Sequence, residues 1–136
     1  MKISILRSIF LRKGGEGIAT RLVAWDADEV KEKIGILLDK DKGEKSFLFY
    51  DESETRWVFL TNLRAIVNQR EKQFDIWFEN VETARLIVRP QKKYWDTFIV
   101  KSKLKGDIVI KLESGGPFWG LYNVFRFIGR HNNSLL

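Results

Sequence analysis

The sequence predicts an α+β fold, in which an antiparallel sheet of about seven strands follows helical segments and is capped by an amphipathic C-terminal helix. Two changes of hydrophobic period favour this fold. Apolar residues recur at helical spacing up to residue 39, alternate at strand spacing from residue 46 to residue 112, and return to helical spacing after residue 116. Because a sheet with one apolar face needs a cover, a single closing helix predicts one domain with one core.

The first predicted element is a short amphipathic helix in residues 1–13. Its apolar residues share one helical face, and they are Ile3, Leu6, Ile9 and Phe10. Ile3, Ile5 and Arg7 also alternate as in a strand, so the period leaves that alternative open. Three glycines within residues 14–17 predict a flexible joint. We therefore expect residues 1–25 to form an N-terminal segment with a joint, and residues 26–136 to form the domain.

A second helix is predicted for residues 26–39. Asp26 and Glu29 form an Asp-x-x-Glu capping pattern at its start. Apolar residues then recur at helical spacing, at Val30, Ile34, Leu37 and Leu38. The polar residues 39–43 give this helix an end in solvent.

Seven strands follow the second helix. We expect them at residues 46–50, 56–60, 63–67, 74–78, 83–89, 95–101 and 107–112. The polar residues 51–55 predict a hairpin loop, and Thr61 with Asn62 predicts a tight turn, because Asn accepts a positive φ. Pro90 and Gly106 mark breaks between the later strands.

The closing helix is predicted to begin after Gly116, with Pro117 in its first turn, where the missing N–H costs nothing. Its apolar stripe consists of Phe118, Leu121, Tyr122, Phe125 and Ile128. Gly129 is predicted to end the helix, and His131 is expected in a tail that frays.

The order of these elements resembles the pleckstrin-homology-like (PH-like) superfold, in which a strongly bent antiparallel sheet, or partly open barrel, is capped by its C-terminal helix. The resemblance covers residues 26–130. Residues 56–66 are similar to a strand-turn-strand of bacterial PH-like domains, with Thr61, Asn62 and Arg64 at the positions that carry the pattern. The resemblance implies a non-enzymatic module that binds phosphoinositides, proteins or further copies of itself.

Positive charge is concentrated in the C-terminal part of the chain. The formal net charge is +6; residues 84–136 hold ten Lys/Arg against three acidic residues, or +7, and residues 1–83 hold fourteen against fifteen, or −1. Such a field attracts anionic partners without choosing among lipid, nucleic acid and acidic protein. Surplus lysine also keeps strand edges from pairing, so charge alone establishes no ligand.

Six basic residues are candidates for one anion-binding cluster, because we expect them at neighbouring strand ends with aromatic rings between them. They are Arg89, Lys92, Lys93, Lys101, Lys103 and Lys105. This cluster predicts peripheral binding to an anionic lipid surface, with the basic N-terminal segment as a second contact. The acidic loop at residues 51–55 argues against inositol-phosphate recognition of the PH type. Nucleic-acid binding is less favoured, because only charge supports it.

Three tryptophans, Trp57, Trp77 and Trp119, are candidates for a protein interface, since exposed tryptophan rings are typical of interface hot spots. The alternative is that they are buried under the N-terminal helices. The sequence therefore predicts, first, protein–protein binding or self-association into a homo-oligomer and, second, peripheral membrane binding.

Neither a catalytic residue, a metal site nor a cofactor is predicted. The chain has no cysteine and one histidine, which excludes disulfides, thiolate sites and two-histidine metal sites within it. The neighbouring carboxylates at residues 26 and 28 and at residues 51 and 52 are explained by a helix cap and a hairpin loop. Arg7 interrupts the apolar opening, unlike a signal peptide. We expect a cytoplasmic protein, with a membrane-peripheral location as the alternative.

Overall fold

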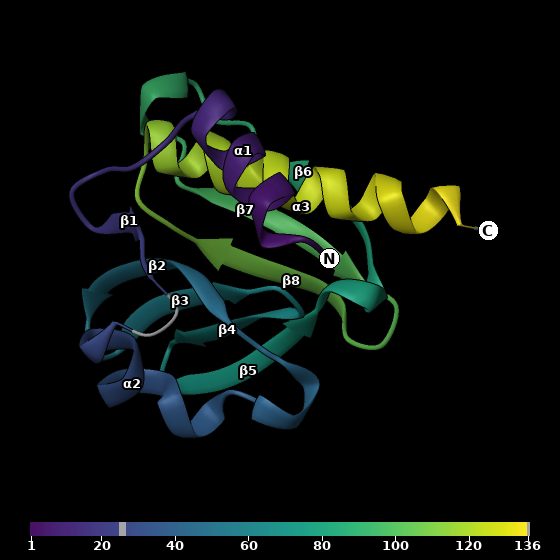
Figure 1. Cartoon of the computed structure of the whole chain (residues 1–136). Helices are drawn as coiled ribbons and strands as arrows, with labels where there is room; N and C mark the ends of the chain where they lie inside the picture. The colour runs from purple at the N-terminus through teal and green to yellow at the C-terminus, as the bar shows by residue number, and fades with distance from the viewer. Residues whose placement is uncertain (25–26, 136) are drawn as a thin grey trace.

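The computed structural model describes residues 1–24 and 27–135, and it has the predicted α+β class (Figure 1). Asp26 of the expected capping pattern lies outside the described residues. The described residues contain eight strands, which form two open antiparallel sheets. Sheet A contains β1 (Thr20–Leu22), β2 (Ser46–Ser53), β3 (Arg56–Thr61), β4 (Arg64–Gln69) and β5 (Lys72–Trp77), in that order. Sheet B contains β6 (Val81–Leu86), β7 (Thr97–Ser102) and β8 (Gly106–Lys111).

The seven predicted strands correspond to β2 through β8, and β1 was not predicted. Three residues are too few to show an alternating period, and β1 exists because its residues pair with Leu48, Phe49 and Tyr50 of β2. The chain forms two sheets instead of one bent sheet because a single 3₁₀ turn, η3 (Phe78–Asn80), separates β5 from β6. With this turn between them, β5 pairs only with β4 in sheet A, and β6 pairs with β7 in sheet B.

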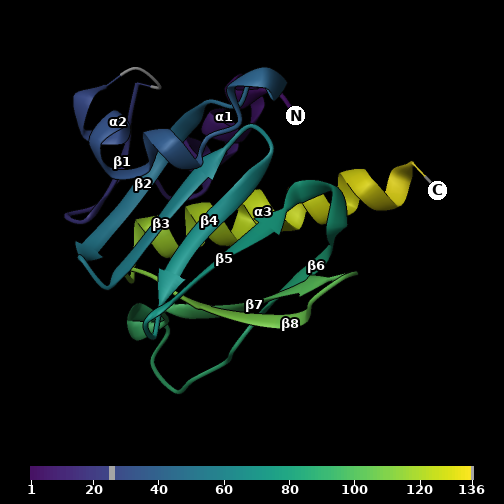
Figure 2. The same ribbon diagram turned by 90° about the horizontal axis from the view of Figure 1, so that it is seen from below.

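The main core lies between the two sheets and the helix α3 (Gly116–Ser134), which packs along sheet B (Figure 2). Phe118, Leu121, Phe125 and Ile128 of the predicted stripe are all essentially inaccessible to solvent. Each such side chain contributes roughly 1.5–3 kcal/mol by leaving water. The stripe is therefore what fixes α3 on sheet B.

The predicted end of α3 at Gly129 was wrong. The helix continues to Ser134, and Gly129 lies inside it, where an added Cβ would be 2.6 Å from the carbonyl oxygen of Glu82 in β6. The glycine thus permits a close approach of helix and strand. The expected frayed tail is also anchored, because Asn132 donates hydrogen bonds to the carbonyl oxygens of Phe78 and Val81, at 2.6 and 2.8 Å.

The helix predicted for residues 26–39 is shorter than expected. It is observed as α2 (Asp28–Ile34), followed by the 3₁₀ turns η1 (Gly35–Leu37) and η2 (Lys40–Lys42). Gly35 is a poor helix former. Asp39 then starts a new turn by accepting hydrogen bonds from the amides of Asp41 and Lys42.

A second apolar cluster covers the outer face of sheet A. Val30 and Ile34 of α2 pack there on Phe49, Phe59 and Ile66 of the sheet. Sheet A is therefore buried on both faces, which explains why its central strands have continuous apolar runs in place of strict alternation.

The N-terminal helix is confirmed as α1 (Ile3–Lys13), and it packs against α3 (Figure 1). Leu6, Ile9 and Phe10 are buried in the main core. Gly14 lies so close to α3 that an added Cβ would overlap the backbone of Gly116. Position 14 therefore needs a glycine, because a side chain there would prevent the close approach to α3. No helix among the described residues has the length and apolar character needed to cross a bilayer.

Candidate functional site

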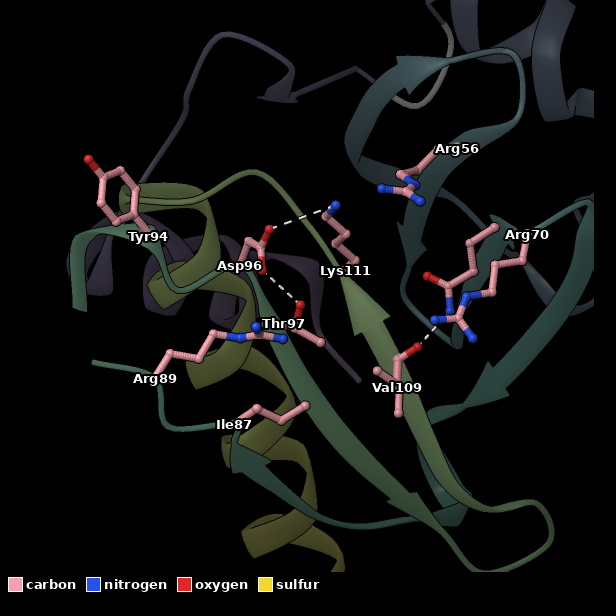
Figure 3. A pocket seen from close by; sticks show the side chains of 10 residues that line it. Arg56, Arg70, Ile87, Arg89, Tyr94, Asp96, Thr97, Val109 and Lys111 are labelled. Carbon is pink, nitrogen blue, oxygen red and sulfur yellow. Dashed lines mark hydrogen bonds and ion pairs between the residues drawn. The ribbon is translucent and has the colours of Figure 1, made fainter. Parts of the chain in front are cut away.

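A cleft of about 470 Å³ opens where sheet A and sheet B meet (Figure 3). Sheet A contributes the start of β3 and the turn between β4 and β5, whereas sheet B contributes β8 and the connection between β6 and β7. We call it the basic cleft. Its charged and hydroxyl-bearing lining residues are Arg56, Arg70, Arg89, Tyr94, Asp96, Thr97 and Lys111.

The lining of the basic cleft is strongly positive, with four cations and one carboxylate, or a net +3. Two of the cations have weak partners: Arg56 Nε lies 3.5 Å from Glu52 Oε2, and Lys111 Nζ lies 4.0 Å from Asp96 Oδ2. Arg70 and Arg89 make no ion pair with any described residue. Two guanidinium groups, one from the turn between β4 and β5 and one from the connection between β6 and β7, are therefore available to an anion.

Arg70 is held at the cleft by an unusual turn. It and Glu71 form the two-residue connection between Gln69 and Lys72, and both have positive φ, at 52° and 62°. Asn and Gly are the usual residues of such a turn, because a Cβ makes positive φ unfavourable. Backbone strain of this kind is often kept where a side chain has a function.

The side of the cleft formed by Arg89 and Tyr94 is fixed by Trp95. Its indole Nε1 donates a hydrogen bond of 2.9 Å to the carbonyl oxygen of Arg89, which closes the connection between β6 and β7 on itself. The Trp95 ring is buried against Trp119 of α3, with ring centroids 5.7 Å apart. The connection is thus anchored to the core while Arg89 and Tyr94 stay exposed.

The six basic residues predicted to form one cluster lie in two groups. Arg89, Lys92 and Lys93 precede β7, whereas Lys101, Lys103 and Lys105 are at its far end or in the turn that follows. Because β7 has six residues, its length of roughly 20 Å separates the groups. Only Arg89 lines the basic cleft.

Several of these lysines already have partners. Lys92 Nζ lies 5.1 Å from the centre of the Trp119 ring, and Lys93 Nζ lies 5.0 Å from that of Tyr94. Lys101 Nζ is 3.5 Å from Glu82, and Lys105 donates a hydrogen bond to the carbonyl oxygen of Asp75.

The three candidate tryptophans are not equivalent. Trp57 lies on the outward face of sheet A but is only 6% exposed, because the second apolar cluster under α2 covers it. Trp77 is half-buried between two cations, with Arg64 Cζ at 4.6 Å and Lys42 Nζ at 5.2 Å from its ring centre. Trp119 is also half-buried and packs on Trp95. The structure therefore gives none of them the fully exposed ring that the interface hypothesis assumes.

Three cations of the cleft, Arg56, Arg70 and Lys111, were not among the sequence candidates. They are far apart in the chain, and they meet only because the two sheets face each other. The one local indication was the unusual pair Arg70 and Glu71 between two strand-like segments, where Asn-Gly is the usual turn.

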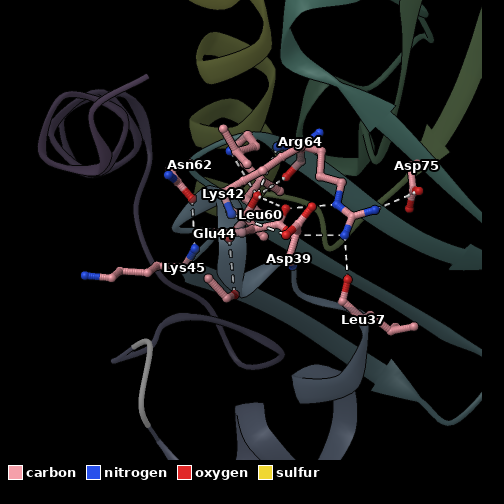
Figure 4. Close-up of polar contacts among 12 residues, drawn as sticks. Leu37, Asp39, Lys42, Glu44, Lys45, Leu60, Asn62, Arg64 and Asp75 are labelled. Atoms are coloured by element: carbon pink, nitrogen blue, oxygen red, sulfur yellow. Dashed lines mark hydrogen bonds and ion pairs between the residues drawn. The ribbon is translucent and has the colours of Figure 1, made fainter.

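A second charged cluster is centred on Arg64, the first residue of β4, which forms ion pairs with Glu44 and Asp75 (Figure 4). Arg64 donates to both carboxylate oxygens of Glu44 at 2.9 Å and to Asp75 at 2.8 Å. It also donates to the carbonyl oxygen of Leu37. The Glu44 side chain is inaccessible to solvent. This cluster fastens the segment between α2 and β2 to sheet A.

The ionisation of this pair follows from its contacts. Burial alone would raise the pKa of Glu44, but hydrogen bonds from Arg64, the Asp39 amide and Thr61 outweigh it and hold the pKa below its usual value. The hydrogen bond to Glu44 likewise raises the pKa of Arg64. Both groups are charged at neutral pH.

The residues that carry the PH-like resemblance belong to this same structural cluster. Thr61 donates to Glu44 at 2.8 Å and accepts from the amides of Leu63 and Arg64. Asn62 accepts from the Lys45 amide at 2.8 Å and donates to the carbonyl oxygen of Gly43. In this chain these residues shape the turn between β3 and β4.

Within the described part of the chain, no three histidine or carboxylate side chains lie close enough together to hold a metal ion. Comparisons of the chain with known protein families, with curated proteins and with solved structures give no match.

Proposed function

We propose that this protein is a non-enzymatic binding module with a PH-like fold, and that it recognises a phosphate-bearing anion in the basic cleft. The order of elements supports the PH-like assignment. Four consecutive antiparallel strands (β2–β5) are followed by three more (β6–β8) and by a C-terminal helix that closes the core. In this proposal α1, β1 and α2 are additions to that arrangement.

One observation carries the ligand class: Arg70 and Arg89 line the same cleft from two separate connections between strands, and neither has an ion-pair partner among the described residues. Guanidinium groups donate two parallel hydrogen bonds to phosphate oxygens, which gives both affinity and orientation. Arg56 and Lys111 add charge at the cleft wall. A phosphate group in the cleft would therefore supply the anionic partner that these arginines lack.

The remaining lining residues fit the same ligand class. The ring of Tyr94 lines the cleft, with its hydroxyl directed away from the other labelled side chains (Figure 3). Asp96 would repel a phosphate, but Thr97 Oγ1 donates to it at 2.8 Å and Lys111 Nζ lies 4.0 Å away. Its charge is thus partly compensated within the cleft.

Protein–protein binding or self-association, the first expectation from the sequence, remains a prediction with weaker support. It needed exposed tryptophan rings, whereas Trp57 is covered by α2 and Trp77 and Trp119 are half-buried. A cytoplasmic location likewise stays a prediction.

Calorimetric titration with inorganic pyrophosphate tests the proposal. The double variant Arg70→Gln with Arg89→Gln should bind at least about tenfold more weakly than the unmodified protein, because two charge-assisted contacts are lost. The matched control is Lys101→Gln with Lys103→Gln, which removes the same charge at the far end of β7 and should leave the affinity within about twofold. Equal losses in both variants, or no binding by the unmodified protein, would contradict the proposal.

A further inference from the structure

The two helices at the ends of the chain, α1 and α3, contain no acidic residue. The chain has 18 Asp and Glu in 136 residues, so helices of 11 and 19 residues would hold about four at the average frequency. They hold none, and they hold five basic residues. These are Arg7, Arg12, Lys13, Arg126 and Arg130. The pair thus carries a formal +5, nearly the whole net charge of the chain.

Four of these cations converge on one groove. A groove of about 460 Å³ runs between α1 and α3, and Arg12, Lys13, Arg126 and Arg130 line it without any carboxylate. None of the four forms an ion pair with a described residue. Figure 1 shows the two helices alongside each other on the side of the molecule away from α2. The groove therefore carries four cations and no carboxylate, and we call the surface of α1 and α3 around it the helix-pair face.

Apolar side chains are exposed on the same helices. Ile5 lines the groove and is 42% exposed, and Leu11, which follows Ser4 and Ser8 of the groove at helical spacing, is 52% exposed. Phe127 of α3 lies half-buried in the groove. Phe127 also packs against the main core, whereas Ile5 and Leu11 do not belong to it, so core packing does not account for the position of these two side chains.

Helix stability explains only part of the charge. Arg12 and Lys13 are in the last turn of α1, where cations interact favourably with the helix dipole. Arg126 and Arg130 are in the interior of α3, where that effect is absent. The dipole also gives no reason for exposed Ile5 and Leu11.

We propose that the helix-pair face docks on an anionic lipid bilayer. Basic residues would meet the lipid phosphates, while Ile5 and Leu11 would enter the boundary between headgroups and acyl chains, as in helices that lie in the plane of a membrane. Nucleic acid offers the same negative charge but no apolar layer for aliphatic side chains, so lipid fits this face better. The face shares no residue with the basic cleft, and the proposal does not depend on the cleft's ligand.

Sedimentation with vesicles of phosphatidylcholine, with and without phosphatidylglycerol, tests this proposal. The protein should bind the anionic vesicles and be released by salt. Each basic residue near an acidic bilayer contributes about fivefold to partitioning, so Arg126→Gln with Arg130→Gln should weaken binding about 25-fold. Ile5→Ser with Leu11→Ser should weaken it roughly tenfold, because half-exposed apolar side chains no longer leave water.

The matched control is Lys31→Gln with Lys40→Gln, which removes the same charge from the side of the molecule that carries α2 and should change partitioning less than twofold. Absence of vesicle binding, or equal losses in the control, would overturn the proposal. The proposal would also be overturned if a short oligonucleotide bound through Arg126 and Arg130 and if Ile5→Ser with Leu11→Ser left that binding unchanged. Arg70→Gln with Arg89→Gln should still bind vesicles, which separates this test from that of the basic cleft.

Discussion

Arg64, at the start of β4, and two arginines of the basic cleft, Arg70 and Arg89, are the same residue type in opposite situations. Arg64 is 8% exposed and donates hydrogen bonds to Glu44, Asp75 and the carbonyl oxygen of Leu37. Arg70 and Arg89 are exposed and have no ion-pair partner among the described residues. The charge of Arg64 is thus paired within the protein, whereas the charges of Arg70 and Arg89 are free to bind a partner from outside it.

Whether a charged side chain is paired and buried or unpaired and exposed distinguishes structural from binding residues better than the number of charges in a segment does. The sequence pattern drew attention to Arg64 through its place after Thr61 and Asn62, yet all three hold a turn together. A buried, paired charge is costly to disturb, while an exposed, unpaired charge can be removed with little effect on folding.

The largest expected effect is on the buried pair. Arg64→Met should lower the free energy of unfolding by about 3–5 kcal/mol, because Glu44 would stay buried without its partner. Chemical denaturation measures this loss. Arg89→Met is the matched control and should cost less than about 0.5 kcal/mol. Similar losses of unfolding free energy in the two variants would mean that Arg64 matters no more for stability than Arg89 does.

A smaller effect is expected from Glu44→Gln, and it should depend on pH. The pKa of Glu44 is lower in the folded protein than in the unfolded chain, so its contribution to stability is complete above the unfolded pKa and is lost as the pH falls through the folded pKa. At pH 7 the variant should be about 1.5–3 kcal/mol less stable, because charged hydrogen bonds to Arg64 become neutral while Arg64 keeps its ion pair with Asp75. The difference should shrink below about pH 4.5, the ordinary value for this carboxyl. A constant difference between pH 7 and pH 3 would show that the charge of Glu44 is not what matters.

The smallest effect on stability is expected at the turn between β4 and β5, and its sign is positive. R70N together with E71G should stabilise the protein by about 1 kcal/mol, because Asn and Gly tolerate the positive φ of these positions. The same change should weaken pyrophosphate binding several-fold, since it removes one cleft arginine. Thermal unfolding and calorimetry measure the two effects. A variant that gains stability and keeps its affinity would remove Arg70 from the site.

Most of the fold follows from local sequence patterns, since short apolar or alternating segments between turn residues predicted β2 through β8, and Pro117 with its apolar stripe predicted α3. The features that the sequence did not predict depend on contacts between distant segments. Strand β1 forms because it pairs with β2, and the predicted helix end at Gly129 was wrong because this glycine allows β6 to approach α3.

The candidate site was predictable only at Arg89. Arg56, Arg70 and Lys111 come from three other strands or turns, and no local pattern shows which strands face one another across a cleft. The burial of Trp57 had a local indication, because the uninterrupted apolar run in β3 is typical of a strand covered on both faces.

If unpaired cations of the basic cleft bind a phosphate-bearing anion, as we propose, amide NMR during titration with pyrophosphate should locate the binding in the cleft. We predict saturable shifts confined to residues of the cleft, with Arg70, Arg89 and Tyr94 among the largest. The amides of Lys31 and Lys101, which lie outside the cleft, should not shift. Small, non-saturating shifts spread over basic residues everywhere would contradict the claim, because they would mean that pyrophosphate follows charge and not a site.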